Sequence, residues 1–348
     1  SSHTRRSSDL NIYASLLYES EFGDRHKLAA GLNYNWDNYS QRGNVIEHYR
    51  PQERNVSESV AGAYAEYTWT PVENFTWMLG LRTDYSNLHH WFVTPRMHLK
   101  YAPVHWLDLR ASAGKGYRTT FIFPENSYLL ASNRMWHIAD DLKQEEAWNY
   151  GISASFHIPI KSEELTVNAE WFYTDFQNQV VIDMDKDTHG IYFYNLDGKS
   201  TSSVFQIDVT YPLFRGFTLL GAYRWMDVKC TYGNRTLRKP LTSRYKALVT
   251  ASYETPLKKW QFDVTVQFNG GGRMPTPGAE HPLWNYTFPS YTLLSAQVTR
   301  RFRRWNIYVG GENLTNYKQK NPIVSAGDPY SPDFDATMVW GPTMGYKL

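Results

Sequence analysis

The chain has 348 residues, and its formal net charge of +2 with 20% charged residues gives no sign of a nucleic-acid partner. Its single cysteine, Cys230, excludes an internal disulfide and a cysteine-rich metal cluster. No apolar run approaches the roughly 18 residues of a membrane-spanning helix, so a membrane protein with this sequence would have to cross as strands.

Alternation of apolar and polar residues with a period of two recurs along the chain. Each such stretch predicts a β-strand, because successive side chains of a strand leave opposite faces. In residues 260–269, for example, Phe262, Val264 and Val266 share one face and polar residues share the other. The predicted strands, in chain order, are 9–19, 25–36, 59–69, 75–85, 95–101, 106–114, 145–156, 165–177, 204–211, 217–228, 244–253, 260–269, 291–302, 305–313 and 340–348.

The connections between these strands alternate between short turns and long loops. The long loops are expected at residues 37–57, 115–144, 178–193, 229–243, 270–288 and 314–339. Prolines 71, 103, 159, 212 and 256 fall in the short turns, where a missing N–H costs no ladder bond. Aromatic residues, 16% of the chain, gather at strand ends. Both features are typical of a transmembrane barrel with tight periplasmic turns, long outer loops and two aromatic girdles, and a soluble β-sandwich is the alternative.

The two faces of the strands predict which side chains meet lipid. The apolar faces that carry Trp77, Leu79 and Leu81, and Phe262, Val264 and Val266, are expected to point to the bilayer. Charged residues on the other face are expected to line the lumen, where they hold a plug, solvate the lumen or touch a substrate: Arg82, Asp84, Asp108 and Arg110.

The long loops are the expected place for ligand capture, because loops on a rigid scaffold commonly carry binding residues. The candidates are His89, His90, Trp91, Phe121, Phe123, Tyr128, Trp136, His137, Trp284 and Tyr286. The alternatives are solvated histidines and aromatic side chains that pack in the outer girdle. No metal site, cofactor or catalytic residue is expected, since no metalloprotease, phosphate-loop or dinucleotide motif is present.

Several short motifs resemble those of TonB-dependent outer-membrane receptors. Residues 310–317, GGENLTNY, resemble the family's GxENLTN(Y/F) strand end. Residues 333–342, DFDATMVWGP, are similar to the approach to the final strand in Bacteroidetes members. GKGYR at 114–118 resembles the GxGFR strand exit, and LKQE at 142–145 resembles the LKPE strand entry with Gln144 in place of proline.

This resemblance implies an all-β, antiparallel, up-and-down transmembrane barrel of 22 strands with a plugged lumen. Residues 1–348 would then be the C-terminal portion of a single barrel domain, with about the last fifteen strands. The plug domain, the TonB box and about seven earlier strands are expected to be absent from this chain. An odd strand number points the same way, because complete barrels of this kind have an even number.

The resemblance also implies a function. It predicts TonB-dependent import of a scarce nutrient, a ferric siderophore or a cobalamin-like chelate, across the outer membrane of a Gram-negative bacterium. The expected partners are outer-membrane lipid, the TonB energy-transducing complex and a large small-molecule ligand, and the resemblance admits a surface lipoprotein. A passive porin and a non-transporting structural or adhesin barrel are the alternatives, and an enzyme is not expected.

Overall fold

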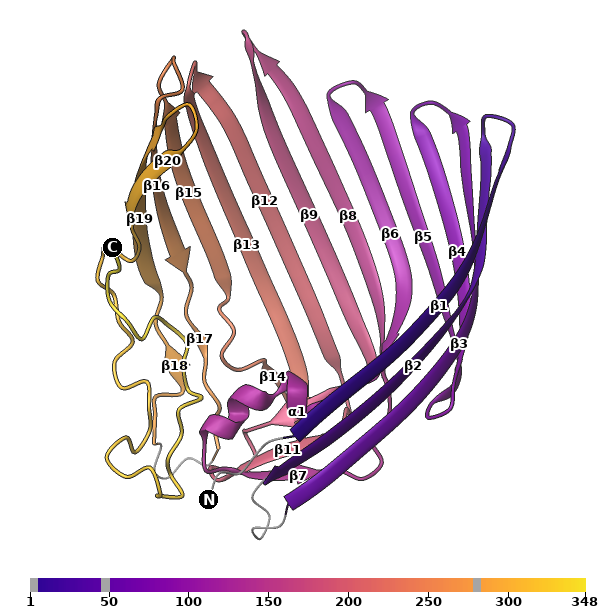
Figure 1. Cartoon of the computed structure of the whole chain (residues 1–348), viewed down its shortest axis with the longest axis vertical. Coiled ribbons are helices and arrows are strands. Elements are labelled where there is room, and N and C mark those ends of the chain that lie inside the picture. The colour runs from indigo at the N-terminus through magenta and orange to yellow at the C-terminus, as the bar shows by residue number, and fades with distance from the viewer. Residues whose placement is uncertain (1–5, 45–50, 278–282) are drawn as a thin grey trace.

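One large antiparallel sheet contains most of the chain in the computed structural model, which describes residues 6–44, 51–277 and 283–348 (Figure 1). Fourteen of its fifteen strands pair in chain order, and β14 (Arg235–Arg238) pairs with β13. The fourteen strands are β1 (Arg6–Phe22), β2 (His26–Asn44), β3 (Pro51–Val72), β4 (Phe75–Ser86), β5 (His90–Val104), β6 (Leu107–Arg118), β8 (Glu145–Ile160), β9 (Glu163–Asn178), β12 (Ser200–Phe214), β13 (Phe217–Tyr232), β15 (Tyr245–Glu254), β16 (Trp260–Asn269), β19 (Tyr291–Arg301) and β20 (Asn306–Gly311).

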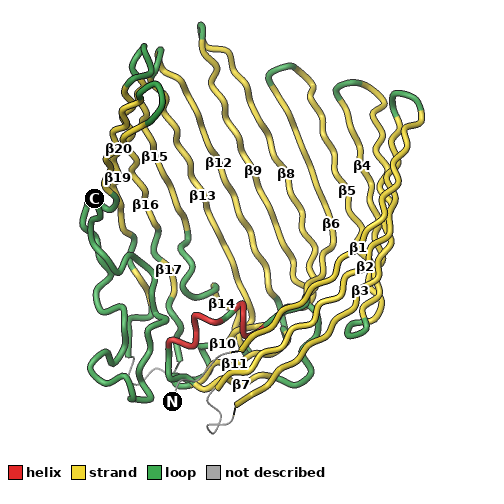
Figure 2. Tube along the Cα trace, viewed as in Figure 1, coloured by secondary structure: helices red, strands yellow, loops and turns green. Residues whose placement is uncertain are grey.

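Neighbouring strands along this path are antiparallel, from Phe22 opposite His26 in the first hairpin to Arg301 opposite Asn306 in the last. Tight turns join the strands at one end of the sheet and longer connections at the other (Figure 2). The sheet curls so that β1, β2 and β3 cross in front of other strands in the view of Figure 1. The predicted all-β meander is therefore confirmed, with β1 and β20 at the two edges of its described part. Among the described residues, no helix is long and apolar enough to cross a membrane.

The alternation in the sequence explains the two faces of the sheet. On β16, Phe262 and Val264 are exposed, while Asp263 between them accepts a 2.6 Å hydrogen bond from Ser252 Oγ. Val264 lies opposite Ala251 on one neighbouring strand and Ala296 on the other, so the apolar face is continuous across strands. Among the described residues, these side chains are exposed rather than packed against a second sheet, which excludes the sandwich alternative.

The first hairpins reach further than expected, and the predicted loop 37–57 is wrong. β2 continues to Asn44 and β3 begins at Pro51, with these two residues paired. Beyond Trp36 the side chains that follow on its face, Asn38 and Ser40, are polar. The backbone pairing of β2 and β3 therefore continues beyond the apolar part of these strands, through residues 37–44 and 51–58, termed the polar ribbon. Apolar and polar residues do not alternate there, so the sequence gives no strand signal. Residues 45–50 of the predicted loop lie outside the described part of the chain.

The predicted strand 340–348 is also wrong. In this stretch the structure shows a single β-bridge, between Lys347 and Glu312. Trp340 stacks on Phe288 with ring centroids 5.4 Å apart, and Gln319 Oε1 accepts a hydrogen bond from the Trp340 backbone N–H. Packing with neighbouring loops therefore competes successfully with strand pairing here.

The long loops contain short regular elements. The connection after β6 holds α1 (Ile122–Glu125), a 3-10 turn (Ser127–Ala131) and β7 (Met135–Ile138). The connection after β9 holds β10 (Val180–Asp183) and β11 (Gly190–Asn195), and β11 pairs in parallel with β7. The connection after β16 holds the pair β17 (Gly272–Arg273) and β18 (Thr287–Phe288).

These loops pack against one another around a hydrophobic cluster, termed the loop core. Its buried members come from at least four connections and are Ile122, Leu129, Trp136, Val180, Met184, Ile191, Phe193, Met274, Phe288 and Met338. Trp136 stacks on Phe123 at 5.6 Å and contacts Phe193 at 5.0 Å between ring centroids. The loop end of the sheet is therefore a packed body rather than a set of independent loops.

Candidate functional site

A cavity of about 480 Å³, termed the outer cavity, lies at the loop end of the sheet. The polar ribbon of β2 and β3, the turn between β4 and β5, and the segment between β6 and α1 enclose it. Its lining residues are Tyr39, Asn55, Val56, Ser57, Leu88, His89, Thr119, Thr120, Phe121, Ile122, Phe123, Asp141, Leu142, Lys143 and Val180.

The turn between β4 and β5 positions His89. Ser86 Oγ accepts hydrogen bonds from the backbone N–H groups of Leu88 and His89, and it donates one to buried Glu58 at 2.7 Å. Asn87 fixes the turn to β3, because its Oδ1 accepts a 2.7 Å hydrogen bond from the Ser59 backbone N–H. These side-chain hydrogen bonds therefore hold the turn in place.

Another part of the outer cavity's lining is aromatic. Tyr39 lies opposite Val56 in the β2–β3 ladder, and its ring centroid is 5.5 Å from that of Phe121. Phe121 precedes α1, and its backbone N–H donates to Glu125 Oε1 at 3.0 Å. The short helix thus anchors the segment that carries this ring.

Two polar atoms of residues lining the outer cavity are buried without a protein partner among the described residues: His89 Nε2 and Thr120 Oγ1. Buried polar groups normally have a hydrogen-bond partner, because leaving one unmade costs about 1–3 kcal/mol. Together with Tyr39 and Phe121, these atoms suit a ligand that has polar groups beside a flat apolar surface.

The structure distributes the ten predicted ligand-binding residues over several environments. His89, Phe121 and Phe123 line the outer cavity, and Tyr286 lines a second cavity of about 860 Å³ with Asp183, Tyr194 and Tyr232. Trp136 is buried in the loop core. Trp284 packs against the loop core, and its Nε1 donates a 2.9 Å hydrogen bond to the Pro275 backbone carbonyl. His137 stacks on Tyr192 at 4.5 Å. His90 and Trp91 belong to β5 rather than to a loop, and Tyr128 is exposed.

The four predicted lumen-lining residues share one face of β4 and β6, opposite the exposed apolar face. Arg82 Nη2 lies 2.6 Å from Asp84 Oδ1, and Asp84 is buried. Lys100 Nζ lies 3.5 Å from Asp108 Oδ1. Lys100 is paired with Arg110 on the neighbouring strand, so the two side chains share a face. Their position at the lumen wall of the complete barrel stays a prediction.

We expect Gly62→Ala to destabilise the barrel by about 1–3 kcal/mol, the usual range for overpacking. A Cβ at Gly62 would lie 2.0 Å from Asp84 Oδ1, whose carboxylate Arg82 already holds. Gly221→Ala is the matched control, because its Cβ would meet no atom within 4 Å. Urea titration of both variants refolded in lipid vesicles measures the difference, and equal free energies of unfolding would contradict the tight fit over Gly62.

Two buried ion pairs fasten the loops to one another. Arg273 bonds Asp185 through two nitrogens, at 2.6 and 2.8 Å, and Thr276 donates to the same carboxylate. Burial tends to raise the pKa of Asp185, but the hydrogen bonds and charge of Arg273 outweigh it and hold that pKa below its usual value. The second pair joins Arg134 to Asp335 at 2.8 Å. Burial lowers the pKa of the Arg134 guanidinium, which the Asp335 carboxylate partly offsets.

Sequence reasoning missed several residues of this region. Tyr39 and Thr120 gave no signal, because one lies in an apparent polar loop and the other is a small polar residue beside aromatic ones. Asp185 and Arg273 could be paired only with the fold in hand, since 88 residues separate them. Within the described residues, no three His, Cys, Asp or Glu side chains are grouped so that they could hold a metal ion.

Comparison with known proteins identifies related sequences and folds. A family model described as TonB dependent receptor-like, beta-barrel, matches residues 2–314. The siderophore receptor PirA from Acinetobacter baumannii is similar in structure, with a TM-score of 0.71, 15% identity, and coverage of 98% of this chain and 54% of the receptor. The ferric enterobactin receptor PfeA from Pseudomonas aeruginosa, as a G324V mutant, gives a TM-score of 0.67, 15% identity, and coverage of 90% and 49%.

The copper transporter OprC is similar at a TM-score of 0.69 and 13% identity, with coverage of 91% of this chain and 52% of OprC. No curated protein matches the sequence significantly. At these identities the structural likeness shows the fold alone. The chain spans about half the length of the solved structures that it matches.

Proposed function

The chain belongs to the family of TonB-dependent receptor-like β-barrels, and on that basis we propose that the intact protein imports a scarce, large ligand across the outer membrane. Barrels of this family are outer-membrane proteins of Gram-negative bacteria, and they are transporters rather than enzymes. The energy for import comes from a TonB partner, and a surface lipoprotein is a further candidate partner.

The observation that carries this proposal is the outer cavity. It lies at the end of the sheet with the long connections, which is the extracellular end in transmembrane barrels. It combines the aromatic rings of Tyr39 and Phe121 with the unpartnered polar atoms of His89 and Thr120.

The ligand class that we propose is a ferric siderophore or a cobalamin-like chelate. Among the structurally similar proteins, PirA is described as a siderophore receptor, PfeA as a ferric enterobactin receptor and OprC as a copper transporter. Large chelates of this kind present polar atoms beside flat ring surfaces, which matches the two kinds of wall in the outer cavity. The lumen-facing charges Arg82, Asp84, Asp108 and Arg110 are proposed to contact a plug or the solvated lumen.

Thr120→Val and His89→Ala should each weaken ligand binding by about tenfold, if each side chain makes one hydrogen bond to the ligand worth about 1.4 kcal/mol. Both changes leave the loop core untouched. Tyr330→Ala is the control, because Tyr330 is 95% exposed on another loop and does not line the cavity.

The measurement is binding of radiolabelled ferric siderophores and cobalamin to cells that express the intact protein. Point substitutions are preferable to deletion of residues 115–144, since that segment supplies Leu129 and Trp136 to the loop core. Unchanged binding in both cavity variants would remove the outer cavity from the proposal. A porin would instead let its solutes pass without measurable binding at the surface.

A further inference from the structure

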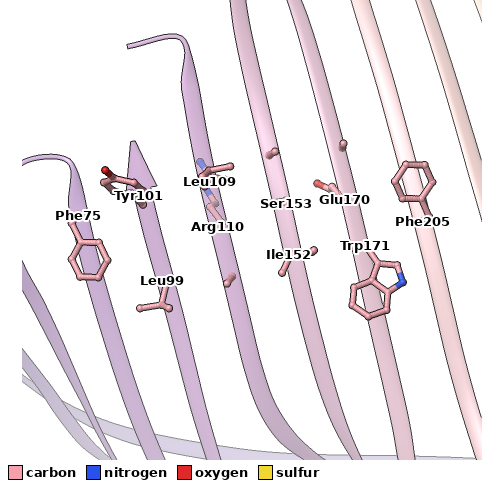
Figure 3. Close-up of a pocket in the computed structure, with 13 residues that line it drawn as sticks. Phe75, Leu99, Tyr101, Leu109, Arg110, Ile152, Ser153, Glu170, Trp171 and Phe205 are labelled. Atoms are coloured by element: carbon pink, nitrogen blue, oxygen red, sulfur yellow. The ribbon is translucent and has the colours of Figure 1, made fainter. Parts of the chain in front are cut away.

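A further hollow, of about 590 Å³, lies on the opposite side of the sheet from the polar face (Figure 3). It spans β4, β5, β6, β8, β9 and β12 and is lined almost entirely by carbon. Figure 3 shows Phe75, Tyr101 and Leu109 at one end, and Ile152, Trp171 and Phe205 at the other. Because the exposed apolar face of the sheet meets the bilayer, this hollow opens towards lipid and not towards the lumen.

The register explains why the surface is hollow here. Four residues are paired side by side across neighbouring strands: Tyr101, Leu109, Ala154 and Ala169. The next row of paired residues on the same face includes Ile152 and Trp171. Two alanines side by side leave a depression beside much larger side chains. The wall is fixed, since Trp171 Nε1 donates to Ser203 Oγ at 3.0 Å.

We propose that this groove, termed the lipid groove, seats one acyl chain of a phospholipid from the periplasmic leaflet. The groove is continuous with the membrane-facing surface of the barrel, which is the contact that the family's outer-membrane location establishes. Phe75 is the first residue of β4 after a tight turn, and Tyr101 lies close to the next tight turn. Tight turns mark the periplasmic end, so the groove begins at the inner interface and runs into the bilayer.

The size of the groove favours a single chain over a protein partner. A helix with its side chains is about 10–12 Å across and would rest on the large side chains rather than fill the depression. Volumes of about 300–1,000 Å³ are typical of sites for single small molecules. A flexible row of methylene groups can follow the floor formed by Ala154 and Ala169 between Leu109 and Trp171. This inference is independent of which ligand the barrel imports.

The test is native mass spectrometry of the intact protein, extracted from outer membranes in a mild detergent. We expect retained phospholipid on the wild type and about tenfold less on Ala154→Phe, which fills the floor of the groove. Ala251→Phe is the matched control, because Ala251 lies on the same apolar face opposite Val264 and outside the groove. It should retain as much phospholipid as the wild type.

Ala169→Leu fills the same floor with a smaller side chain, and it should also reduce phospholipid retention. It replaces Ala154→Phe in the test if that variant fails to assemble. Assembly is checked by the heat-dependent shift in gel mobility of folded barrels. Equal phospholipid retention in all variants, no retained phospholipid on the wild type, or loss of lipopolysaccharide instead of phospholipid would each overturn the proposal.

Discussion

Val264→Arg should lower the stability of the barrel by roughly 2–4 kcal/mol, the cost of an arginine near the middle of the bilayer on a lipid-facing strand. Val264 is 43% exposed and lies between Ala251 and Ala296 on neighbouring strands, so its two paired neighbours offer no partner to a charge. Leu79→Arg on β4 should behave in the same way, because Leu79 is exposed on the same face. Urea titration in vesicles measures both effects.

Thr265→Arg is the matched control for this prediction. Thr265 is the next residue of β16, at the same depth, but it faces the polar side and bonds Thr250 Oγ1 at 2.9 Å. Its replacement should cost much less, because an arginine there can reach water. A similar loss of stability for the two arginines would show that the faces are assigned wrongly.

Asp185→Ala should open the loop core, at a cost of about 3 kcal/mol to the local stability of the loops. Removing one partner of a buried ion pair leaves the other charge uncompensated, which typically costs about 3–5 kcal/mol. The lower end applies because the Arg273 side chain keeps 14% of its surface exposed. Hydrogen exchange of residues 272–277 measures the opening.

Asp333→Ala is the control, since Asp333 also joins two loops, through a 2.7 Å contact with His189, but on the surface. Exposed pairs contribute about 0–1 kcal/mol, so exchange should change little.

The buried pair of Asp185 and Arg273 also predicts a pH dependence. Because the folded pKa of Asp185 is lowered, its contribution is complete above the unfolded pKa of 3.8 and is lost as the pH falls through the folded value. Faster exchange in Asp333→Ala than in Asp185→Ala would contradict this account.

The alternation of side chains was sufficient to predict the fourteen strands that pair in chain order in the large sheet, because each strand in a barrel is apolar on one face and wet on the other. It failed where that environment ends. β2 continues past Trp36, and β3 begins before Ser59, the partner of Trp36; apolar residues are few in both stretches, so the backbone pairing there leaves no alternating pattern of side-chain polarity. Residues 340–348 keep a strand-like sequence, yet Trp340 packs on Phe288 and Tyr291 instead.

The candidate site was predictable only in part. The sequence places aromatic residues in the long loops, but it does not show which of them face a cavity and which fill a core. Phe121 lines the outer cavity, whereas Trp136, fifteen positions later, is buried between Phe123 and Phe193. That difference depends on contacts between loops far apart in the chain.

The central proposal, energised import after capture at the outer surface, is tested most directly by measuring binding and accumulation of one labelled ligand in the same cells, with and without TonB. A barrel of about 22 strands is wide enough to need a plug, and moving a plug requires work. Cells without TonB should therefore bind the ligand at the surface as wild-type cells do but accumulate none. Undiminished accumulation without TonB would contradict the proposal and favour a passive porin.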